Sequence, residues 1–462
     1  MVPKAVKDYV DSHRQRFLEE LLELLRFASI SAGEDRLSEC QACAEHLAGA
    51  FRKLGFLAEL RPCGKSPNVL ARSGPGMAPA EAPTVLVYGH YDVQPVEPLS
   101  AWKSPPFQPA VRDGFIYARG ASDDKGQLLC HVKAAEAYLR TQGRLPANLV
   151  FLLEGQEEIG SGGMEKFLSQ HAGELVADYA VLSDTAFFAA GVPSIIYGLR
   201  GLACVELTLS GPRQDLHSGV HGGGVVNPLN AVARMVAAMH DERGRITLPG
   251  FYDEVVETTD QERRLWQRLP LTAGQYAAEV GAEPVGGEAG RDLWERRWAR
   301  PTLDCNGIVG GHAGAGSKTV IPAQAVAKIS MRLVPRQGPE KIVESFRAFV
   351  AGHTPAGVRA SVATFGLARP VLIPMDTPAI SAARAALKEA FAADALPIRD
   401  GASVPITELI QRVLKLDPIL LGLGLPDDNL HAPNERFSLD QFHRGIHAAA
   451  AVLLNLGALG RR

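Results

Sequence analysis

Cysteine is scarce in this sequence, with six residues in a chain of 462. So few thiols over such a length do not suggest a disulfide framework of the kind that holds small secreted domains together. Two of them, Cys40 and Cys43, make a C-x-x-C pair, which raises redox or zinc chemistry as an alternative. Cys40 fits the apolar stripe of an amphipathic helix predicted over residues 37–54, and no second pair completes a structural zinc site. We therefore interpret the pair as part of the protein core.

The sequence also lacks a long hydrophobic run and an excess of charge of either sign. No stretch is long enough to span a bilayer, so we expect no membrane segment. Residues 1–20 carry charges where a secretion signal needs its apolar stretch, which favours a cytoplasmic location. A formal net charge of -3 argues against a broad basic surface, and we expect no nucleic-acid partner.

The overall composition is that of a soluble globular protein, with 46% hydrophobic and 21% charged residues. At this length, two domains are a better expectation than one. Apolar residues at helical spacing predict an opening helix over residues 6–25 and a second helix over 37–54. Strand and helix patterns then alternate up to about Asp184. This alternation predicts an α/β fold with a mostly parallel sheet.

The pattern changes near residues 199–201. The segment ACVELTLS alternates apolar and polar residues, as a half-exposed antiparallel strand does, and further helical and strand segments follow. We predict a smaller α+β domain of residues 200–375, inserted into a mostly parallel α/β domain formed by 1–199 and 376–462. Residues 250–301 have no clear pattern, and their layout is left unassigned.

Residues of metal-ligand type stand at the ends of the predicted buried strands. The apolar runs TVLVYGH, LVFLLEGQEE and YAVLSD end at His90, Glu158 and Asp184, and such strands emerge at one edge of a parallel sheet. That edge is where open α/β sheets bind ligands. Asp123 and His431 add two more residues of ligand type. The five residues together predict a metal site with hydrolytic chemistry.

Two divalent ions suit this set of residues. Zinc takes histidine nitrogen and carboxylate oxygen, and two ions about 3.5 to 4 Å apart can hold a water and an amide oxygen together. Glu157 directly precedes Glu158, and adjacent side chains at a strand end point in different directions, so one is predicted as a ligand and the other as a general base. Asp92 lies two residues after His90 and is predicted to accept the other ring N–H of that imidazole.

Each of these features has a simpler interpretation when taken alone. Single histidines are more often surface or hydrogen-bonded core residues, Asp123 with Asp124 suits a turn or a helix N-cap, and the pair Glu157 and Glu158 suits a solvated surface. Jointly these interpretations weaken, because carboxylates that end apolar strands do not belong to a solvated run. A noncatalytic binding protein is a further alternative, which Glu157 disfavours because a structural metal site needs no spare base. The glycine-rich stretches lack the lysine of a phosphate-binding loop, which disfavours nucleotide binding.

Seven segments carry a resemblance to a known family. In chain order they read VLVYGHYDVQPVEP, PPFQPAVRDGFIYARGASDDKGQL, LLEGQEEIGSGG, VLSDT, RQDLHSGVHGG, SKTVIPAQAVAKISMRLVP and NLHAPNE. They resemble the successive signature blocks of the dinuclear-zinc metallopeptidase family that contains carnosinases, cytosolic nonspecific dipeptidases, succinyl-diaminopimelate desuccinylase, acetylornithine deacetylase and carboxypeptidase G. The blocks follow the family order over nearly the whole chain, and HYDVQP and GASDDKG are most similar to the dipeptidase branch.

The resemblance implies two divalent metal ions per subunit, with zinc as the first choice and manganese or cobalt as alternatives. Asp123 would bridge the two ions. His90 and Asp184 would complete the first ion. Glu158 and His431 would complete the second. The peptide bond that follows the bridging aspartate is typically cis in this family, and we expect it to be cis here.

The resemblance also implies how the enzyme would work. Glu157 would be the general base, deprotonating a water that bridges the metal ions and passing the proton to the leaving amine. The inserted domain is similar to the family's lid and dimerisation domain. In a homodimer, His217 would reach the site of the partner subunit and stabilise the tetrahedral oxyanion.

Substrate contacts follow from the same resemblance. Arg332 and Ser403 would hold the free carboxylate of the substrate, with Asn306 and Thr319 nearby. A guanidinium can clamp a carboxylate with two hydrogen bonds, although an arginine on an alternating strand can instead face solvent. The chain departs from the dipeptidase pattern at residues 366–371, where it reads GLARPV and many relatives have a His-Gly-Gly segment followed by Pro-Trp.

The expected activity is therefore hydrolysis of the amide bond of short peptides, most of all unblocked dipeptides, by a cytoplasmic homodimer. The alternative within the same class is an N-acyl amino acid deacylase of the desuccinylase or deacetylase type. It would share the metal ions and differ only in its lid contacts.

Overall fold

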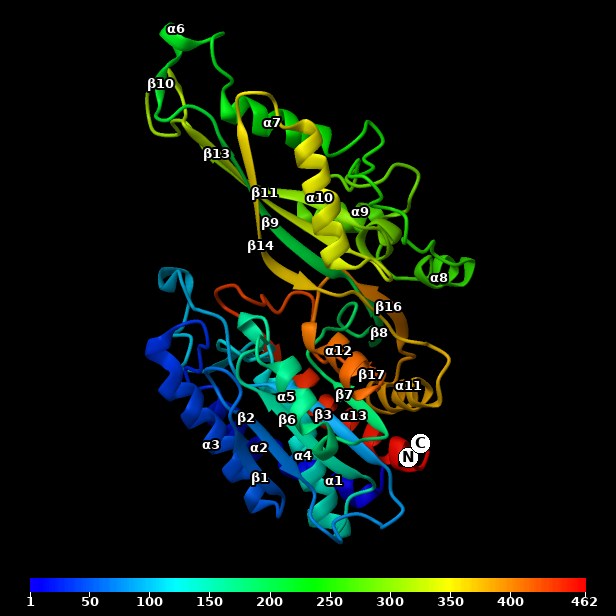
Figure 1. Cartoon of the computed structure of the whole chain (residues 1–462). Helices are drawn as coiled ribbons and strands as arrows, with labels where there is room; N and C mark the ends of the chain where they lie inside the picture. The colour runs from blue at the N-terminus through cyan, green and yellow to red at the C-terminus, as the bar shows by residue number, and fades with distance from the viewer. The chain divides into compact units, whose positions relative to one another are not determined.

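The computed structural model describes residues 1–462, and the chain divides into two compact units. The first unit consists of Met1–Tyr197, Ile373–Ile398 and Pro405–Arg462, and the second of Gly198–Leu372 and Arg399–Val404. The predicted domain boundaries lie within a few residues of the main division points. The short second piece of the second unit lies beyond them, inside the segment predicted for the first domain. Figure 1 labels most of the helices and strands of both units.

Nine strands form the largest sheet. They are β1 (Leu57–Arg61), β2 (Asn68–Arg72), β3 (Thr84–His90), β6 (Asn148–Glu154), β7 (Tyr179–Leu182), β8 (Ser194–Leu199), β15 (Val371–Leu372), β16 (Leu396–Asp400) and β17 (Pro418–Leu420). Their order is β1-β2-β6-β3-β7-β17-β8-β15, and β16 pairs with β8. The central strands β6, β3, β7 and β17 run parallel, and the pairings on both sides of them are antiparallel. The predicted α/β fold is confirmed, with antiparallel strands added at the edges.

The apolar runs of the sequence explain the parallel centre of the sheet. Residues 85–90 of β3 and 149–154 of β6 are all buried, as in strands that are covered on both faces. Helix α4 (Lys125–Gln142) packs against β3, and α13 (Leu439–Gly457) packs against α4 (Figure 1). The unit also contains α3 (Leu37–Lys53), α5 (Met164–His171), α11 (Pro378–Phe391), α12 (Pro405–Leu409) and a small sheet of β4 (Ala110–Arg112), β5 (Phe115–Tyr117) and β18 (Arg436–Ser438).

One predicted helix is divided in the structure. The expected helix over residues 6–25 is two helices, α1 (Lys4–Ser12) and α2 (Arg14–Leu24), which are separated at His13. The backbone of His13 has φ -109° and ψ 14°, outside the helical region. Buried apolar residues occur on both sides of the break, so the spacing of apolar residues alone could not reveal it.

The second unit is built on an antiparallel sheet. Its strands are β9 (Gly201–Ser210), β10 (Leu216–His217), β11 (Thr302–Gly310), β12 (Val320–Ile321), β13 (Gln324–Leu333) and β14 (Arg359–Ala368). Four of them form a sheet in the order β11-β13-β9-β14, and β10 pairs with β12. Alternate residues of β9 are buried against α7 (Pro228–Ala238) and α10 (Pro339–His353). The predicted alternating strand and the α+β character of this region are confirmed.

Residues 250–301, which the sequence left unassigned, contain only short helical segments. Helices α8 (Asp260–Trp266) and α9 (Ala273–Val280) each begin with a capping box, in which a threonine and the residue three positions later exchange hydrogen bonds. Arg300 donates two hydrogen bonds to the buried carboxylate of Glu288, at 2.9 and 2.8 Å. Side-chain contacts of this kind leave no periodic pattern in a sequence, which explains why the layout could not be predicted.

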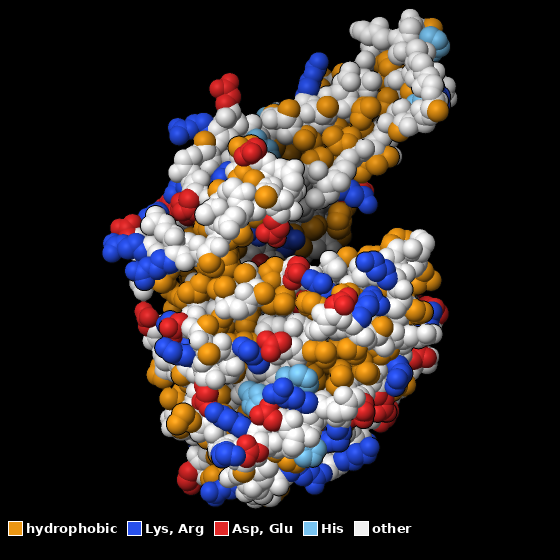
Figure 2. Space-filling view, turned by 180° about the vertical axis from the view of Figure 1, so that it is seen from behind, with side chains coloured by type: hydrophobic (Ala, Val, Ile, Leu, Met, Phe, Trp, Pro, Cys, Tyr) orange, Lys and Arg blue, Asp and Glu red, His pale blue; other side chains and the backbone are white.

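Charged side chains of both signs are interspersed over the face of the molecule shown in Figure 2. This distribution agrees with the small formal net charge of -3. None of the helices combines the length and the hydropathy that a bilayer-spanning segment needs.

Candidate metal centre

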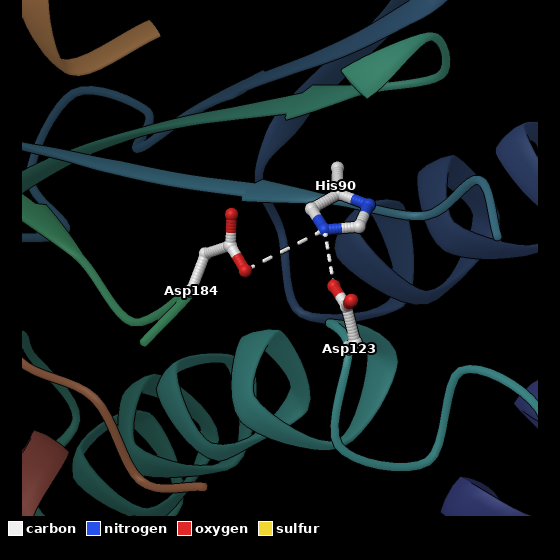
Figure 3. A group of neighbouring side chains, drawn as sticks. All are labelled: His90, Asp123 and Asp184. Carbon is white, nitrogen blue, oxygen red and sulfur yellow. Dashed lines mark hydrogen bonds and ion pairs between the residues drawn. The ribbon is translucent and has the colours of Figure 1, made fainter. Parts of the chain in front are cut away.

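Two predicted ligands stand at the carboxyl ends of neighbouring strands. His90 is the last residue of β3, and Asp184 lies two residues after β7. Because β3 and β7 are paired in parallel, both side chains reach the same edge of the sheet. Figure 3 shows the side chains of His90, Asp123 and Asp184 pointing toward one another.

Loops supply the other predicted ligands and the predicted base, Glu157. Glu157 and Glu158 begin a 3-10 turn three residues after β6. Asp123 lies just before α4, and its peptide bond to Asp124 is cis, as expected. His431 lies in the loop between β17 and β18, where its backbone adopts a left-handed conformation with φ 59°. The site therefore joins segments that are far apart in the sequence.

The five predicted ligands form two groups that share Asp123. In the first group, His90 Nε2 lies 3.0 Å from Asp123 Oδ1 and 3.7 Å from Asp184 Oδ1. In the second, His431 Nε2 lies 3.0 Å from Asp123 Oδ2 and 3.3 Å from Glu158 Oε2. The ligand atoms of each group all lie within 4.8 Å of one another. Each oxygen of the shared aspartate therefore faces a different histidine, which is the geometry that a bridging carboxylate needs.

The donor atoms fit two divalent ions. Each group offers one imidazole nitrogen and two carboxylates, which are donors that zinc accepts. Catalytic zinc sites use three protein ligands and keep a further position for water or substrate. The residues present therefore have both the types and the number that a two-ion catalytic centre requires.

The electrostatics of the cluster also favour cations. Burial raises the pKa of the Glu157 carboxyl well above its usual value, and the nearby carboxyl groups of Asp184 and Glu158 raise it further. Burial also raises the pKa of Asp184 and of Glu158 themselves. Hydrogen bonding to Asp123 raises the pKa of His431 to about 10. Buried carboxylates repel one another, so divalent ions between them would relieve the repulsion.

Asp92 makes contacts that the sequence did not suggest. Its Oδ1 and Oδ2 atoms accept hydrogen bonds from the backbone N–H groups of Glu157 and Glu158, each at 3.1 Å. Its Oδ2 also accepts a hydrogen bond from Ser31 Oγ at 2.6 Å. His90 Nδ1 lies 3.1 Å from the Asp92 carbonyl oxygen and 3.5 Å from its carboxylate. The carbonyl is thus the nearer acceptor for the imidazole, and the carboxylate orients the candidate base and a candidate ligand through their backbone.

Two residues beside the centre were missed in the sequence. Gln94 Nε2 donates a hydrogen bond to Glu158 Oε2 at 2.7 Å. Glu435 Oε1 accepts one from the backbone N–H of Asp123 at 3.1 Å. Glu435 belongs to the NLHAPNE segment, so the motif contained a signal. Its partners lie more than 300 positions away, and nothing local in the sequence identifies them.

Two predicted substrate contacts meet in the second unit. Arg332 Nη1 donates a hydrogen bond to Ser403 Oγ at 3.1 Å, and the Ser403 hydroxyl donates to the carbonyl of Arg200 at 2.5 Å. Asn306 is exposed and lies where the register of β11 and β13 shifts. Arg332 pairs with Thr302, and four residues of strand span about 13 Å. The structure therefore brings Arg332 and Ser403 together and places Asn306 further along the sheet.

His217 and Thr319 lie together in another part of the second unit. His217 pairs with Val320 between β10 and β12, and the Thr319 carbonyl accepts a hydrogen bond from the backbone N–H of Ser218 at 3.0 Å. The exposed imidazole of His217 accepts a hydrogen bond at Nδ1 from the N–H of Gly219, at 3.0 Å. This pair adjoins the β13 end opposite Arg332, and the strand spans about 30 Å. The predicted substrate contacts of this unit therefore form two separate groups.

A parallel-centred α/β sheet with two histidine and carboxylate groups and a spare half-buried glutamate at its carboxyl edge defines a metal-dependent hydrolase. The particular family follows from a match over most of the chain. The model of peptidase family M20/M25/M40 matches residues 86–455, and the chain belongs to this family.

Curated relatives are similar over nearly the whole length. The Cys-Gly metallodipeptidase dug1 of Schizosaccharomyces pombe is 31% identical over 461 residues, which cover 95% of each chain. The Beta-Ala-His dipeptidase of Homo sapiens is 29% identical and covers 98% of this chain and 92% of its own.

Solved structures agree. Human carnosine dipeptidase 1 matches with a TM-score of 0.84 and 27% identity, covering 99% of this chain and 100% of that chain. The M20 family metallo-carboxypeptidase Sso-CP2 from Sulfolobus solfataricus matches with a TM-score of 0.86 and 31% identity, covering 96% and 99%. The predicted fold class and the resemblance to the dipeptidase branch are confirmed.

Proposed function

We propose that the protein is a dipeptidase that hydrolyses the amide bond of unblocked dipeptides. One observation carries this proposal: Asp123 is shared by two histidine and carboxylate groups, and the half-buried Glu157 lies beside the candidate ligand Glu158. A metal site that serves only structure has no use for a spare carboxyl group beside its ligands. Full-length similarity to relatives named as dipeptidases supports the substrate class.

The residues of the two groups would hold two divalent ions, with zinc favoured by the histidine and carboxylate donors and manganese or cobalt as alternatives. His90 and Asp184 would hold one ion. Glu158 and His431 would hold the other, with Asp123 shared. Such ions supply Lewis acidity, which polarises the amide carbonyl and makes water a nucleophile near neutral pH.

Glu157 would move the proton in this reaction. Its carboxylate takes a proton from the attacking water while the new C–O bond forms, and it gives the proton to the amine as the C–N bond breaks. Its backbone N–H is fixed by Asp92, which limits the freedom of the side chain. Burial favours the protonated form of this carboxyl group, and a carboxylate that has taken a proton from water can return it to the leaving amine.

Arg332 and Ser403 would bind the free carboxylate of the substrate. The 3.1 Å distance between Arg332 Nη1 and Ser403 Oγ supports this role, because both groups lie within reach of one anion. The Ser403 hydroxyl would turn from the Arg200 carbonyl to donate to that anion. Asn306 and Thr319 are also proposed as substrate contacts. They have less structural support, because they lie apart from Arg332 and Ser403 in the second unit.

We also propose that His217 completes the site of a partner subunit in a homodimer. Its imidazole is exposed, and it lies in a segment with exposed apolar side chains, among them Val220 at 72% and Val225 at 41%. Such side chains are the kind that a second copy of the chain would cover. In the partner's site, the imidazole would donate a hydrogen bond to the oxyanion.

The deacylase alternative has less support. It would use the same metal ions and the same Glu157, and it would differ in how the second unit recognises the substrate. The GLARPV segment at residues 366–371, where the dipeptidase pattern is not followed, is the feature in its favour.

The decisive experiment measures amino acid release from a panel of unblocked dipeptides, N-acetyl amino acids and N-succinyl amino acids by protein loaded with zinc or manganese. We expect release from the dipeptides, and a fall in kcat of about 10²–10⁴-fold in Glu157→Gln with both ions still bound. Glu19→Gln, in the exposed part of α2, is the matched control and should keep full activity. Turnover of the acylated compounds alone would favour the deacylase. No turnover of any compound with both ions bound would overturn the substrate class.

A further inference from the structure

Four hydrogen-bond donors surround a single buried carboxylate beside the candidate metal centre. Glu435 is fully buried. Its Oε1 accepts hydrogen bonds from the backbone N–H groups of Ser122 at 3.0 Å and Asp123 at 3.1 Å. Its Oε2 accepts from the backbone N–H of Gly120 at 3.0 Å and from Arg119 Nη1 at 2.8 Å. The donors come from one loop, and that loop ends in the shared aspartate.

This arrangement resembles an anion-binding loop whose anion is part of the chain. Successive backbone N–H groups that converge on one point attract negative charge. Here the carboxylate of Glu435 fills that point, and the Arg119 guanidinium, which is also buried, adds a full positive charge. An ionised carboxylate has only acceptor atoms, so four donors match it without leaving an unpaired partner. The Glu435 side chain, which comes from the C-terminal segment, therefore stabilises the loop conformation that presents Asp123.

A second anchor lies on the other side of His431. Asp428 Oδ2 accepts hydrogen bonds from Ser122 Oγ at 2.7 Å and from the backbone N–H of Leu425 at 2.8 Å. Asp428 precedes His431 by three residues, and Glu435 follows it by four. Both ends of the segment that carries this histidine are thus bonded to the residues next to Asp123.

His431 needs such anchors more than His90 does. Its side chain is 58% exposed, whereas the His90 side chain is fully buried at the end of a strand. Its backbone is left-handed, as are those of Asn429 and Asn434 in the same loop. A loop of this kind has no sheet hydrogen bonds to fix a ligand, so the position of the imidazole depends on the contacts at its two ends.

We propose that Glu435 is a positioning residue that couples the loop of Asp123 to the segment of His431 and so sets the affinity of the second ion, the one shared by Glu158, Asp123 and His431. The proposal rests on the proposed function, because it takes these residues as metal ligands. It extends that function, because it identifies Glu435 as the side chain that keeps Asp123 and His431, two ligands of the second ion, in position. The first ion keeps His90 at the end of β3 and Asp184 just after β7, and it depends less on Glu435.

The test measures zinc binding by the full-length protein with a competing chelator, together with zinc content per chain and the thermal midpoint of the zinc-free protein. In Glu435→Gln, an amide N–H₂ replaces one acceptor and faces backbone N–H donors. We expect the affinity for the more weakly held zinc to fall about 10–100-fold, as changes to groups that orient metal ligands typically do. We expect a smaller change for the tighter ion. Dipeptide hydrolysis should fall at limiting zinc and recover as zinc is raised.

Two further variants separate positioning from folding. Glu136→Gln is the matched control, because Glu136 is also buried and ion-paired, with Arg16 and Lys133, in the same unit. It should lower the thermal midpoint and leave both zinc affinities unchanged. Ser122→Ala removes one hydrogen bond of the Asp428 anchor without removing a charge, and should weaken the same zinc by a smaller factor.

The outcomes distinguish this proposal from the proposed function. Wild-type zinc affinities in both Glu435→Gln and Ser122→Ala would overturn the positioning role, and so would equal losses of zinc in Glu136→Gln. If Glu435→Gln does not fold, Glu435→Asp takes its place in the same measurements, because it keeps the charge and withdraws the carboxylate from the loop donors by one methylene group. A wild-type protein that binds two zinc ions but hydrolyses no dipeptide would overturn the proposed substrate and leave the positioning role to be judged on zinc affinity.

Discussion

The two ligand groups of the candidate centre are held in different ways. His90 and Asp184 follow paired parallel strands, and the His90 side chain is fully buried. His431 stands on a loop with a left-handed backbone, and its side chain is 58% exposed. The hydrogen bonds of the sheet position the first group, whereas polar contacts between loops position the second. The two halves of one centre should therefore respond differently to the same kind of change.

The largest effect is expected where the two groups meet, because Asp123 belongs to both. Asp123→Asn keeps the size of the side chain and removes its charge. Both groups then lose a charged ligand, so both should be weakened to a similar extent. We expect both ions to bind more weakly and hydrolysis to fall by roughly a hundredfold or more, beyond the effect typical of groups that only orient ligands. Zinc content per chain and dipeptide turnover check this. Retention of two tightly bound ions would show that Asp123 is not shared.

The next effect compares the two histidines directly. His431→Ala should keep one ion and destabilise the metal-free protein less than His90→Ala does, because the side chain is exposed and its removal opens no cavity. His90→Ala should lose the ion of the first group and destabilise the metal-free protein by about 2 kcal/mol, because it opens a cavity in the core. Denaturant unfolding and zinc content measure both. Equal stability changes would contradict the proposed difference.

A smaller effect, on stability, is expected at His131, which contacts the residue next to the candidate ligand Asp184. His131 Nε2 lies 2.6 Å from Ser183 Oγ, next to Asp184, and burial lowers the pKa of His131 to about 4. In the unfolded chain His131 has the ordinary pKa of about 6.5, so the unfolded state binds a proton at a higher pH than the folded state does. The free energy of unfolding therefore decreases as the pH falls from about 6.5 toward 4. Between pH 7 and pH 5, the titration of His131 should lower the free energy of unfolding by about 2 kcal/mol.

The check is the unfolding free energy of the metal-free protein at both pH values. His131→Leu should lose about 2 kcal/mol less than wild type over this interval, because leucine binds no proton. All other titrating groups are present in both proteins, so the difference isolates His131. Parallel pH profiles would mean that His131 is not held neutral.

The smallest effect is expected at Gln94, which touches only the second group. Gln94→Leu removes the 2.7 Å hydrogen bond to Glu158 Oε2. The affinity for the second ion should fall by about tenfold, at the low end for groups that orient a ligand, with the first ion unchanged. Chelator competition measures the two affinities separately. An equal weakening of both ions would argue against separate supports for the two groups.

The first ligand group was more open to prediction than the second. His90 and Asp184 end apolar runs, and the burial of such runs places their ends at one edge of a sheet without knowledge of distant contacts. The alternation of β9 likewise predicted which of its residues are buried. The break at His13 could not be predicted, because the apolar spacing continues across it.

The contacts of Asp92 show the limit of local reasoning. Its position two residues after His90 predicted a contact with that imidazole, and its carboxylate lies 3.5 Å from His90 Nδ1. The same carboxylate also accepts hydrogen bonds from the backbone of Glu157 and Glu158, which the sequence did not suggest. Those residues follow another strand, and the parallel pairing of β3 with β6 brings them close. Spacing along one strand cannot show which neighbouring strand supplies the partner.

The sequence by itself determined the types of residue at the candidate centre, the apolar runs that carry three of them to a sheet edge and the family to which the chain belongs. These are properties of short segments, set by side-chain chemistry and by periodic burial. Only the tertiary structure decided that one oxygen of Asp123 faces His90 and the other faces His431, 308 positions away, and that Glu435 holds the loop between them. Such contacts depend on how the whole chain packs, because no local pattern encodes the meeting of two distant loops.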